Sequence, residues 1–354
     1  MNPTRRSWRL ATAALVSAGL LGTGVAIGAS TADSAPVSRP AAASAPAVTG
    51  TTSYASVVRQ VVPSVVQIRT QDGLGSGVIL DDKGHIVTNA HVTGDATSFQ
   101  VQLADDPAPR SAHLVGSYRP DDLAVIRADD ADGLKPARLG DSSKAKPGDV
   151  VLAVGNPLGL TSSITDGIIS ATGRSVTEPG SADTPAATLP NAIQTSAAIN
   201  PGNSGGALVN LAGEVIGIPT LAAASPGNGA PAPGIGFAIP SNVVRDIADQ
   251  IIESGHVTDS HRAAIGAQIT TTTNADGTPA GAGIVAVTPG GAADRAGLRA
   301  GDVIRSLGST QTPTGEALAQ TLAGMRPGQH VTATVVRDGS SQDVQLTLGQ
   351  LPGS

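Results

Sequence analysis

Short apolar segments separated by glycine and aspartate turns run through the chain from Tyr54 to Pro240. Their apolar residues are mostly Val, Ile, Ala and Leu, and aromatic side chains make up only 1% of the sequence. The core must therefore be built from β-branched packing, which favours strands. Apart from a short apolar helix or turn ending at Pro63, the region shows no alternation of strands with helices, as a parallel α/β sheet would. We predict an all-β domain in the form of a double barrel.

One helix is predicted to close this domain. Val244, Ile247, Ala248, Ile251 and Ile252 recur at helical spacing. Ser241 is expected to cap the N-terminus of the helix through its hydroxyl, and Gly255 to end it. Its expected role is to pack against the second barrel. The domain is thus predicted to span residues 52–256, and a short polar segment separates it from a second unit over residues 262–351.

The first fifty residues are expected to lie outside both domains. Arg5, Arg6 and Arg9 precede an apolar run from Leu10 to about Ala29, the pattern of a secretory signal peptide. A run of this length is also compatible with an uncleaved membrane anchor, so residues 1–30 are predicted to be one or the other. Residues 31–51 are Ala, Pro and Ser with almost no large apolar side chains, which predicts a disordered linker.

Composition excludes several classes of function. The net charge is −6 and the region after residue 30 has no Lys/Arg cluster, so nucleic-acid binding is not expected. The absence of cysteine excludes disulfides, thiol catalysis and cysteine metal sites. The chain also lacks a GxxxxGK[ST] phosphate loop and an HExxH helix. We therefore expect no cofactor and no metal.

A serine among glycines is the strongest candidate for a catalytic group. Ser204 lies in Gly202-Asn203-Ser204-Gly205-Gly206, where the missing side chains allow backbone N–H groups to face an oxyanion about 3 Å away. The motif alone is equally compatible with a polar turn between strands. It also matches the GxSxG elbow of α/β-hydrolases, but there the acid and histidine follow the serine, and the surrounding sequence lacks a strand, elbow and helix.

Two upstream segments supply partners for Ser204. His91 follows an apolar strand in Ile86-Val87-Thr88-Asn89-Ala90-His91-Val92 and is the best general base. Asp122 directly precedes the apolar strand Leu123-Ala124-Val125-Ile126, where a buried acid would orient the imidazole. His85 and His113 lie in polar or exposed contexts and are interpreted as solvated. The chain order of histidine, aspartate and serine is that of chymotrypsin-type proteases.

At these motifs the chain resembles the HtrA/Deg serine proteases. TNAHV at 88–92, DLAVI at 122–126 and GNSGGAL at 202–208 carry the resemblance, with further matches at 75–79, 155–159 and 234–240. It covers roughly Tyr54 to Leu351. The resemblance implies a mainly β fold, a chymotrypsin-type double β-barrel followed by an α+β PDZ domain. It also implies the triad His91, Asp122 and Ser204, with the N–H groups of Gly202 and Ser204, together with Asn203, as the oxyanion hole.

The second unit resembles a PDZ domain. The matching pieces are Ala264-Ile265-Gly266, the stretch 292–304 and a helix from Gly315 to Met325. N–H groups near Ile265 and Gly266 would receive a peptide C-terminus while the ligand adds a strand to the sheet edge. Leu318 and Leu322 are expected to line the groove, although either is equally compatible with ordinary core. Ala264 stands where a bulky residue is common.

Specificity and assembly follow from the same resemblance. In proteases of this type the residue six before the nucleophile lies at the base of the substrate pocket, which here is Ala198, followed by Ile199. Small or medium aliphatic residues are therefore expected before the cut. Ser196 replaces a common Asp, and the connection from Ile68 to Gly75 lacks a long regulatory loop. A homotrimer is implied, for which Tyr54 is the one aromatic residue near the expected contact.

The sequence thus predicts an extracytoplasmic, ATP-independent serine endopeptidase that degrades misfolded or damaged proteins and binds C-terminal peptides at its PDZ domain. It would be secreted or attached to the membrane through residues 1–30. The alternative is a peptide-binding chaperone or scaffold with little or no proteolysis.

Overall fold

The computed structural model describes residues 53–71, 73–106, 108–156, 163–178, 187–200, 202–224 and 231–353. The predicted signal segment 1–30 and linker 31–51 lie outside the described residues, as do Pro201 and residues 157–159. In the described part of the chain, no helix is both long enough and apolar enough to cross a membrane.

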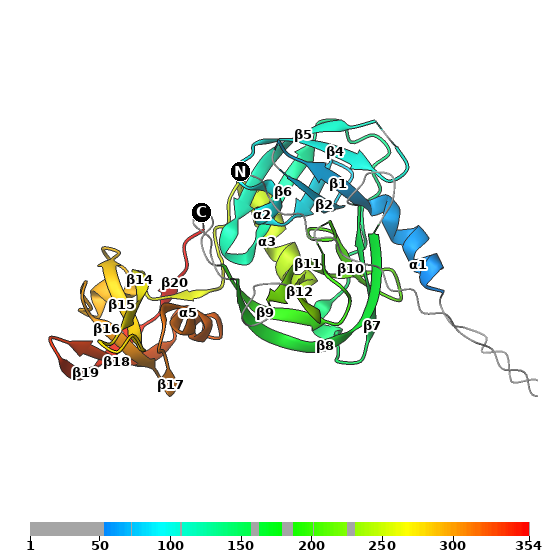
Figure 1. Ribbon diagram of the computed structural model, residues 1–354. Coiled ribbons are helices and arrows are strands. Elements are labelled where there is room, and N and C mark those ends of the chain that lie inside the picture. Colours follow the sequence, from blue (N-terminus) through cyan, green and yellow to red (C-terminus); the bar gives the residue numbers. More distant parts are fainter. Residues whose placement is uncertain are drawn as a thin grey trace, which may run out of the picture. The chain divides into compact units, whose positions relative to one another are not determined.

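A closed six-stranded barrel forms the first half of the N-terminal domain (Figure 1). Helix α1 (Tyr54–Val61) and the 3-10 turn η1 (Val62–Ser64) lead into it. Large apolar side chains such as Ile68, Ile86 and Ile126 are fully buried inside. The strands are β1 (Val65–Arg69), β2 (Leu74–Ile79), β3 (His85–Thr88), β4 (Ser98–Leu103), β5 (Arg110–Tyr118) and β6 (Leu123–Ala128), in the order β1-β2-β3-β6-β5-β4.

A second closed barrel follows, shown in green in Figure 1. Its strands are β7 (Val150–Gly155), β8 (Ser163–Glu178), β9 (Ala187–Thr195), β10 (Ala207–Asn210), β11 (Val215–Ala224) and β12 (Pro231–Pro240), in the order β10-β11-β12-β9-β8-β7. The 3-10 turn η3 (Ser142–Lys144) lies in the connection between the barrels. One apolar cluster joins them, since Val87 of the first barrel and Leu152 of the second belong to it. The predicted double barrel is confirmed.

Helix α3 (Ser241–Ser254) packs on both barrels, against strands β5 and β6 as well as β11 and β12. The expected packing of the helix against the second barrel is confirmed, and the helix packs against the first barrel as well. The predicted cap was wrong, because Pro240 is the N-cap residue and the Ser241 hydroxyl donates to the carbonyl oxygen of Gly140 at 2.8 Å. Gly255 does end the helix, with φ of 77° and its N–H bonded to the Ile251 oxygen. Burial of the Ile and Val face outweighs local capping here.

The C-terminal unit is an α+β fold with its own core. Helix α5 begins at Gly315 as predicted but ends at Ala323, two residues before Met325. The main sheet contains β14 (Ala267–Thr273), β15 (Pro279–Val287), β16 (Val303–Leu307), β18 (His330–Arg337) and β19 (Ser340–Thr347), with β17 (Thr310–Gln311) paired to β16. A two-stranded sheet of β13 (Ala263–Ala264) and β20 (Gly349–Gln350) and the helices α4 (Ala292–Arg295) and α5 (Gly315–Ala323) complete it.

Val257 lies one residue beyond the predicted end of the protease domain, yet it is only 1% exposed and belongs to the core cluster of the barrels. The Gln250 side chain also binds the backbone N–H groups of Thr258 and Asp259. The core of the double-barrel domain therefore extends past residue 256, and the connecting segment begins as part of it.

Candidate active site

Asp122 is held in an unusual backbone conformation at the start of β6. The 3-10 turn η2 (Arg119–Asp121) ends in it, and its φ and ψ of 52° and 42° are left-handed, which aspartate tolerates better than most residues. Its N–H donates to the Arg119 oxygen at 3.0 Å. The side chain is thereby turned inward, and the residue is only 4% exposed.

The carboxylate of Asp122 binds His91 twice. His91 lies in the single helical turn α2 (Ala90–Thr93) that follows β3. Its backbone N–H donates to Asp122 Oδ1 at 2.9 Å, and its ring Nδ1 lies 2.8 Å from Oδ2. The Asp122 carbonyl oxygen in turn accepts from the Asn89 amide and the Ala90 N–H. Both the position of the histidine backbone and the direction of its ring are therefore fixed by one carboxylate.

Thr220 of β11 connects this pair to the serine. Its hydroxyl donates to Asp122 Oδ2, and its carbonyl oxygen accepts from Ser204 Oγ at 3.4 Å. Thr220 is 4% exposed. Neither Thr220 nor Asn89 was predicted from the sequence. The available signal for Thr220 was a hydroxyl within the otherwise apolar strand of the second barrel.

The turn that carries Ser204 packs against the first barrel without room for side chains. A Cβ on Gly205, whose φ is 78°, would lie against the carbonyl oxygen of Ser76 and 2.5 Å from Thr88 Oγ1. The Ser204 carbonyl oxygen accepts from the Ser76 N–H at 3.1 Å. The glycines after the serine thus let the turn approach strands β2 and β3, next to the segment that carries His91.

The turn before Ser204 is closed by Asn203. Its N–H donates to the Asn200 oxygen at 3.1 Å, its side-chain amide donates to the Ala198 oxygen, and its side-chain oxygen accepts from the Asn200 N–H. The expectation that Asn203 belongs to the oxyanion hole is therefore corrected, because its donors serve the turn itself. In the described part of the chain the N–H groups of Gly202 and Ser204 donate to no acceptor. Gly202 has φ of 114°, which favours glycine.

The two residues expected in the substrate pocket differ in exposure. Ala198 is exposed, and its carbonyl oxygen accepts from the Thr165 hydroxyl at 2.8 Å. Ile199 is only 6% exposed and belongs to the core of the second barrel, where it contacts the backbone of Gly236. The expectation for Ile199 is corrected, since its side chain serves packing. Ser196 bonds to Ile168 with both its N–H and its hydroxyl oxygen, and so joins the end of β9 to β8.

The remaining histidines of the first barrel lie elsewhere. His85 is buried and its Nδ1 lies 2.6 Å from Asp81 Oδ2, so its interpretation as solvated was wrong. The pKa of Asp81 is lowered by these His85 contacts in spite of partial burial, which opposes them. His113 is exposed and pairs with Asp129 at 2.9 Å. The first pair lies at the turn between β2 and β3, and the second joins β5 to the residue that follows β6.

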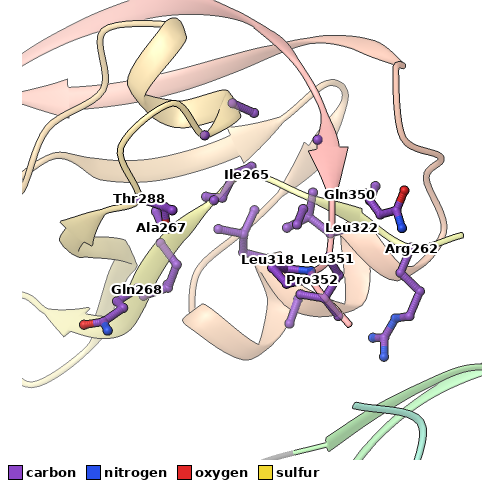
Figure 2. Close-up of a pocket in the computed structure, with 18 of the residues that line it drawn as sticks. Arg262, Ile265, Ala267, Gln268, Thr288, Leu318, Leu322, Gln350, Leu351 and Pro352 are labelled. Carbon is purple, nitrogen blue, oxygen red and sulfur yellow. The ribbon is translucent and has the colours of Figure 1, made fainter. Parts of the chain in front are cut away.

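A groove in the C-terminal unit lies between β14 and α5 (Figure 2). All four residues named from the sequence line it: Ile265, Gly266, Leu318 and Leu322. Leu318 is 1% exposed and belongs to the core, whereas Leu322 is partly buried beside it. Strand β14 pairs with β15 on one side and, within the described residues, with no strand on its other side. An apolar channel therefore runs along an open strand edge.

Comparison with known proteins agrees with this architecture. Residues 75–218 match the family described as a trypsin-like peptidase domain, and residues 263–348 match the PDZ domain family. The serine protease PepD of Mycobacterium tuberculosis is 38% identical over 96% of this chain and 76% of its own length. This chain belongs to the HtrA family of serine proteases.

Other relatives match the protease over different shares of their own length. The periplasmic serine endoprotease DegP of Escherichia coli K12 is 41% identical over 78% of the chain, and the chain spans only 57% of DegP. The solved structure of the HtrA-type protease AlgW with a decapeptide matches 85% of the chain and 99% of AlgW. Its sequence identity is 34% and its TM-score is 0.57.

Proposed function

We propose that this protease is an extracytoplasmic, ATP-independent serine endopeptidase that degrades misfolded or damaged proteins. The observation that carries the proposal is the Asp122 carboxylate, which binds both the ring and the backbone of His91 and is joined through Thr220 to the turn of Ser204. This arrangement supplies a base, an acid that orients it and a serine, in the order of the chymotrypsin-type triad. The names of DegP and other relatives, which are periplasmic endoproteases, support the location.

In the proposed reaction, His91 takes the hydroxyl proton of Ser204 while Oγ attacks the peptide carbonyl carbon. Asp122 stays ionised, holds the proton on His91 Nδ1 and stabilises the imidazolium. The N–H groups of Gly202 and Ser204 stabilise the oxyanion that forms. His91 then protonates the leaving amine, and water attacks the acyl-enzyme by the same route in reverse.

Covalent labelling tests this assignment. A fluorophosphonate probe should label the wild-type chain and the Ser196→Ala variant, whose lost hydroxyl is exposed, but should not label Ser204→Ala. Casein degradation should follow the same pattern. Labelling that persists in Ser204→Ala would exclude Ser204 as the nucleophile. A wild-type chain that protects unfolded clients without labelling or cleaving them would favour a chaperone instead.

We further propose that cleavage follows small or medium aliphatic residues. Ala198 is exposed at the position expected beneath the substrate side chain and carries no charge that would bind a basic group. In a peptide library, Val, Ala and Ile should dominate the position before the cut. Ala198→Asp should raise the share of Lys and Arg there. A wild-type profile led by Lys or Arg would contradict the proposal.

We also propose that the PDZ groove binds peptide C-termini as an added strand on β14. The apolar lining by Leu318 and Leu322 and the open strand edge support this, as does the peptide named in the AlgW structure. Leu322→Glu should abolish binding of labelled apolar C-terminal peptides in fluorescence anisotropy. Val285→Glu changes a side chain that is 55% exposed outside the groove and should leave binding intact. Equal loss in both variants would refute the site.

We also propose that residues 1–30 direct export, either as a cleaved signal or as a membrane anchor. A homotrimer is a further part of the proposal. Tyr54 of α1 is 42% exposed and is available for a contact between copies. Sedimentation of the wild type and Tyr54→Ala would test the trimer, which the variant should weaken. A wild type that sediments as a monomer at high concentration would exclude it.

A further inference from the structure

Ser76 lies on β2 of the first barrel, and its side chain reaches the oxyanion turn of the second barrel. The residue is fully buried. Its hydroxyl donates to the carbonyl oxygen of Gly202 at 2.6 Å, across 126 residues of chain. Its backbone N–H donates to the carbonyl oxygen of Ser204. Ser76 therefore holds the turn at two points, on either side of Asn203.

The direction of the hydroxyl proton follows from a third contact. The N–H of Asn156, at the end of β7, donates to Ser76 Oγ at 2.8 Å. Since an N–H group can only donate, Oγ is the acceptor there and its single proton is left for Gly202. The three groups form a short chain of hydrogen bonds whose members polarise one another in a buried setting.

The peptide unit between Gly202 and Asn203 is consequently fixed at both ends. Its oxygen is held by the Ser76 hydroxyl, and its N–H is held by the Asn200 oxygen at 3.1 Å. The proposed oxyanion donors, the N–H groups of Gly202 and Ser204, flank this unit directly along the chain. With φ of 114°, Gly202 has the freedom of glycine to rotate, so the orientation of its neighbours depends on such outside contacts.

We infer that Ser76 is a positioning residue for the oxyanion hole. It fixes the peptide between Gly202 and Asn203 so that the two flanking N–H groups face the substrate oxygen, and it has no contact with the substrate itself. The inference rests on the proposed function, because it assigns these N–H groups to the oxyanion. Loss of the hydroxyl would leave the Gly202 oxygen buried without this donor and allow the turn to relax.

A second buried serine provides a matched control. Ser241 is also fully buried, and its hydroxyl makes the same kind of bond, to the Gly140 oxygen at 2.8 Å. Ser241→Ala therefore removes an equivalent hydrogen bond at the start of α3, outside the residues assigned to the active site. Any effect of losing a buried serine bond on stability alone should appear in both variants.

The test compares Ser76→Ala and Ser241→Ala on a small peptide substrate and on a peptide aldehyde, whose adduct places an oxygen in the oxyanion hole. Ser76→Ala should lower kcat by about 10- to 100-fold, somewhat less than removal of an oxyanion donor, and leave KM unchanged. Aldehyde affinity should fall by a similar factor, while affinity for the cleaved product stays the same. Ser241→Ala should change none of these. Ser76→Cys, with similar size and a weak donor, gives the same comparison if the alanine variant does not fold.

The inference would be overturned if Ser76→Ala had the same kcat and the same aldehyde affinity as Ser241→Ala. If Ser76→Ala does not fold, Ser76→Cys takes its place in this comparison. A loss confined to KM would also overturn the inference, because that would place Ser76 in substrate binding. These failures are separate from failure of the proposed function. If the inference alone is wrong, the wild type still turns over substrate and Ser204→Ala does not, whereas a wild type without turnover or labelling refutes the proposed function itself.

Discussion

At the scale of single residues, Thr220 is the clearest case of a group that the sequence did not reveal. Chain order and flanking strands led to the proposed triad of His91, Asp122 and Ser204. Thr220 meets Asp122 across 98 residues, and this pairing depends on how two barrels pack. A single threonine in an apolar strand carries no periodicity or spacing that would predict such a contact.

Removal of the Thr220 hydroxyl should therefore impair catalysis. Thr220→Val keeps the shape of the side chain and takes away a donor to a buried carboxylate, a bond of the stronger, charge-assisted kind. We expect kcat/KM on a peptide substrate to fall by about 10- to 100-fold, and Thr220→Ser to retain most of the activity. A valine variant as active as the serine variant would show that Asp122 needs no support from β11.

Asp302 gives a prediction about acid stability. Arg337 binds both of its carboxylate oxygens at 2.7 Å and holds the pKa of Asp302 below its usual value of 3.8. A lowered pKa in the folded state adds stability above the usual pKa, and this contribution is lost as the pH falls through the lower folded value. Urea unfolding should show the PDZ domain weakening below about pH 4.

Asp302→Asn should have an unfolding free energy about 1–3 kcal/mol lower than that of the wild type at pH 7. On acidification its unfolding free energy should fall less than that of the wild type. The two unfolding free energies should therefore approach each other as the pH falls from 5 to about 2. A constant difference over this range would show that the Asp302 carboxylate is not the group that titrates.

At the scale of elements, the strands and α3 were predicted, but the contacts at the N-terminus of α3 were not. Burial decides which segments form strands, and the recurring Val and Ile residues report burial directly. The ends depend on local competition. Ser241 was expected to cap its own helix, but its hydroxyl bonds to Gly140 instead. Asn203 was likewise expected in the oxyanion hole, but its N–H and its side-chain amide donate to carbonyl oxygens of the turn.

The contact between α3 and β5 depends on a glycine. A Cβ on Gly116 would press on the Gly255 carbonyl oxygen at the end of α3 and lie 2.9 Å from Ile251 Cγ2. Gly116→Ala should therefore lower the unfolding free energy by about 1–3 kcal/mol, as overpacking does. Gly324→Ala places its Cβ no closer than 3.6 Å to its neighbours and should be nearly neutral. Equal midpoints in chemical denaturation would show that α3 can shift freely.

At the scale of the whole molecule, the segment that joins the two domains is hydrogen-bonded to the protease domain next to Asp122. Arg262 donates to Asp121 Oδ1 and to the Pro120 oxygen, both at 2.7 Å, and to the Thr188 oxygen at 2.9 Å. Asp121 directly precedes Asp122. Burial raises the pKa of Asp121, and the neighbouring guanidinium of Arg262 opposes this rise.

A double-mutant cycle tests this contact. Arg262→Ala leaves the Asp121 carboxylate buried without its cation and should cost about 3 kcal/mol at pH 7. Asp121→Asn should cost less, since a neutral amide oxygen can still accept from Arg262. The double variant should recover part of the loss in Arg262→Ala. Additive losses in thermal or urea unfolding would mean that the two side chains act independently.

The position of Ser204 against the first barrel has one more consequence. Ser204, the oxyanion turn and Thr220 belong to the second barrel, whereas His91, Asp122 and Ser76 belong to the first. The bonds from Ser76 to Gly202 and Ser204 and from Thr220 to Asp122 therefore cross from one barrel to the other. The alignment of the proposed triad therefore depends on the distance between the two barrels. A small separation of the barrels that leaves every strand intact would therefore move Ser204 away from His91, and the proposed reaction would be impaired before either barrel unfolds.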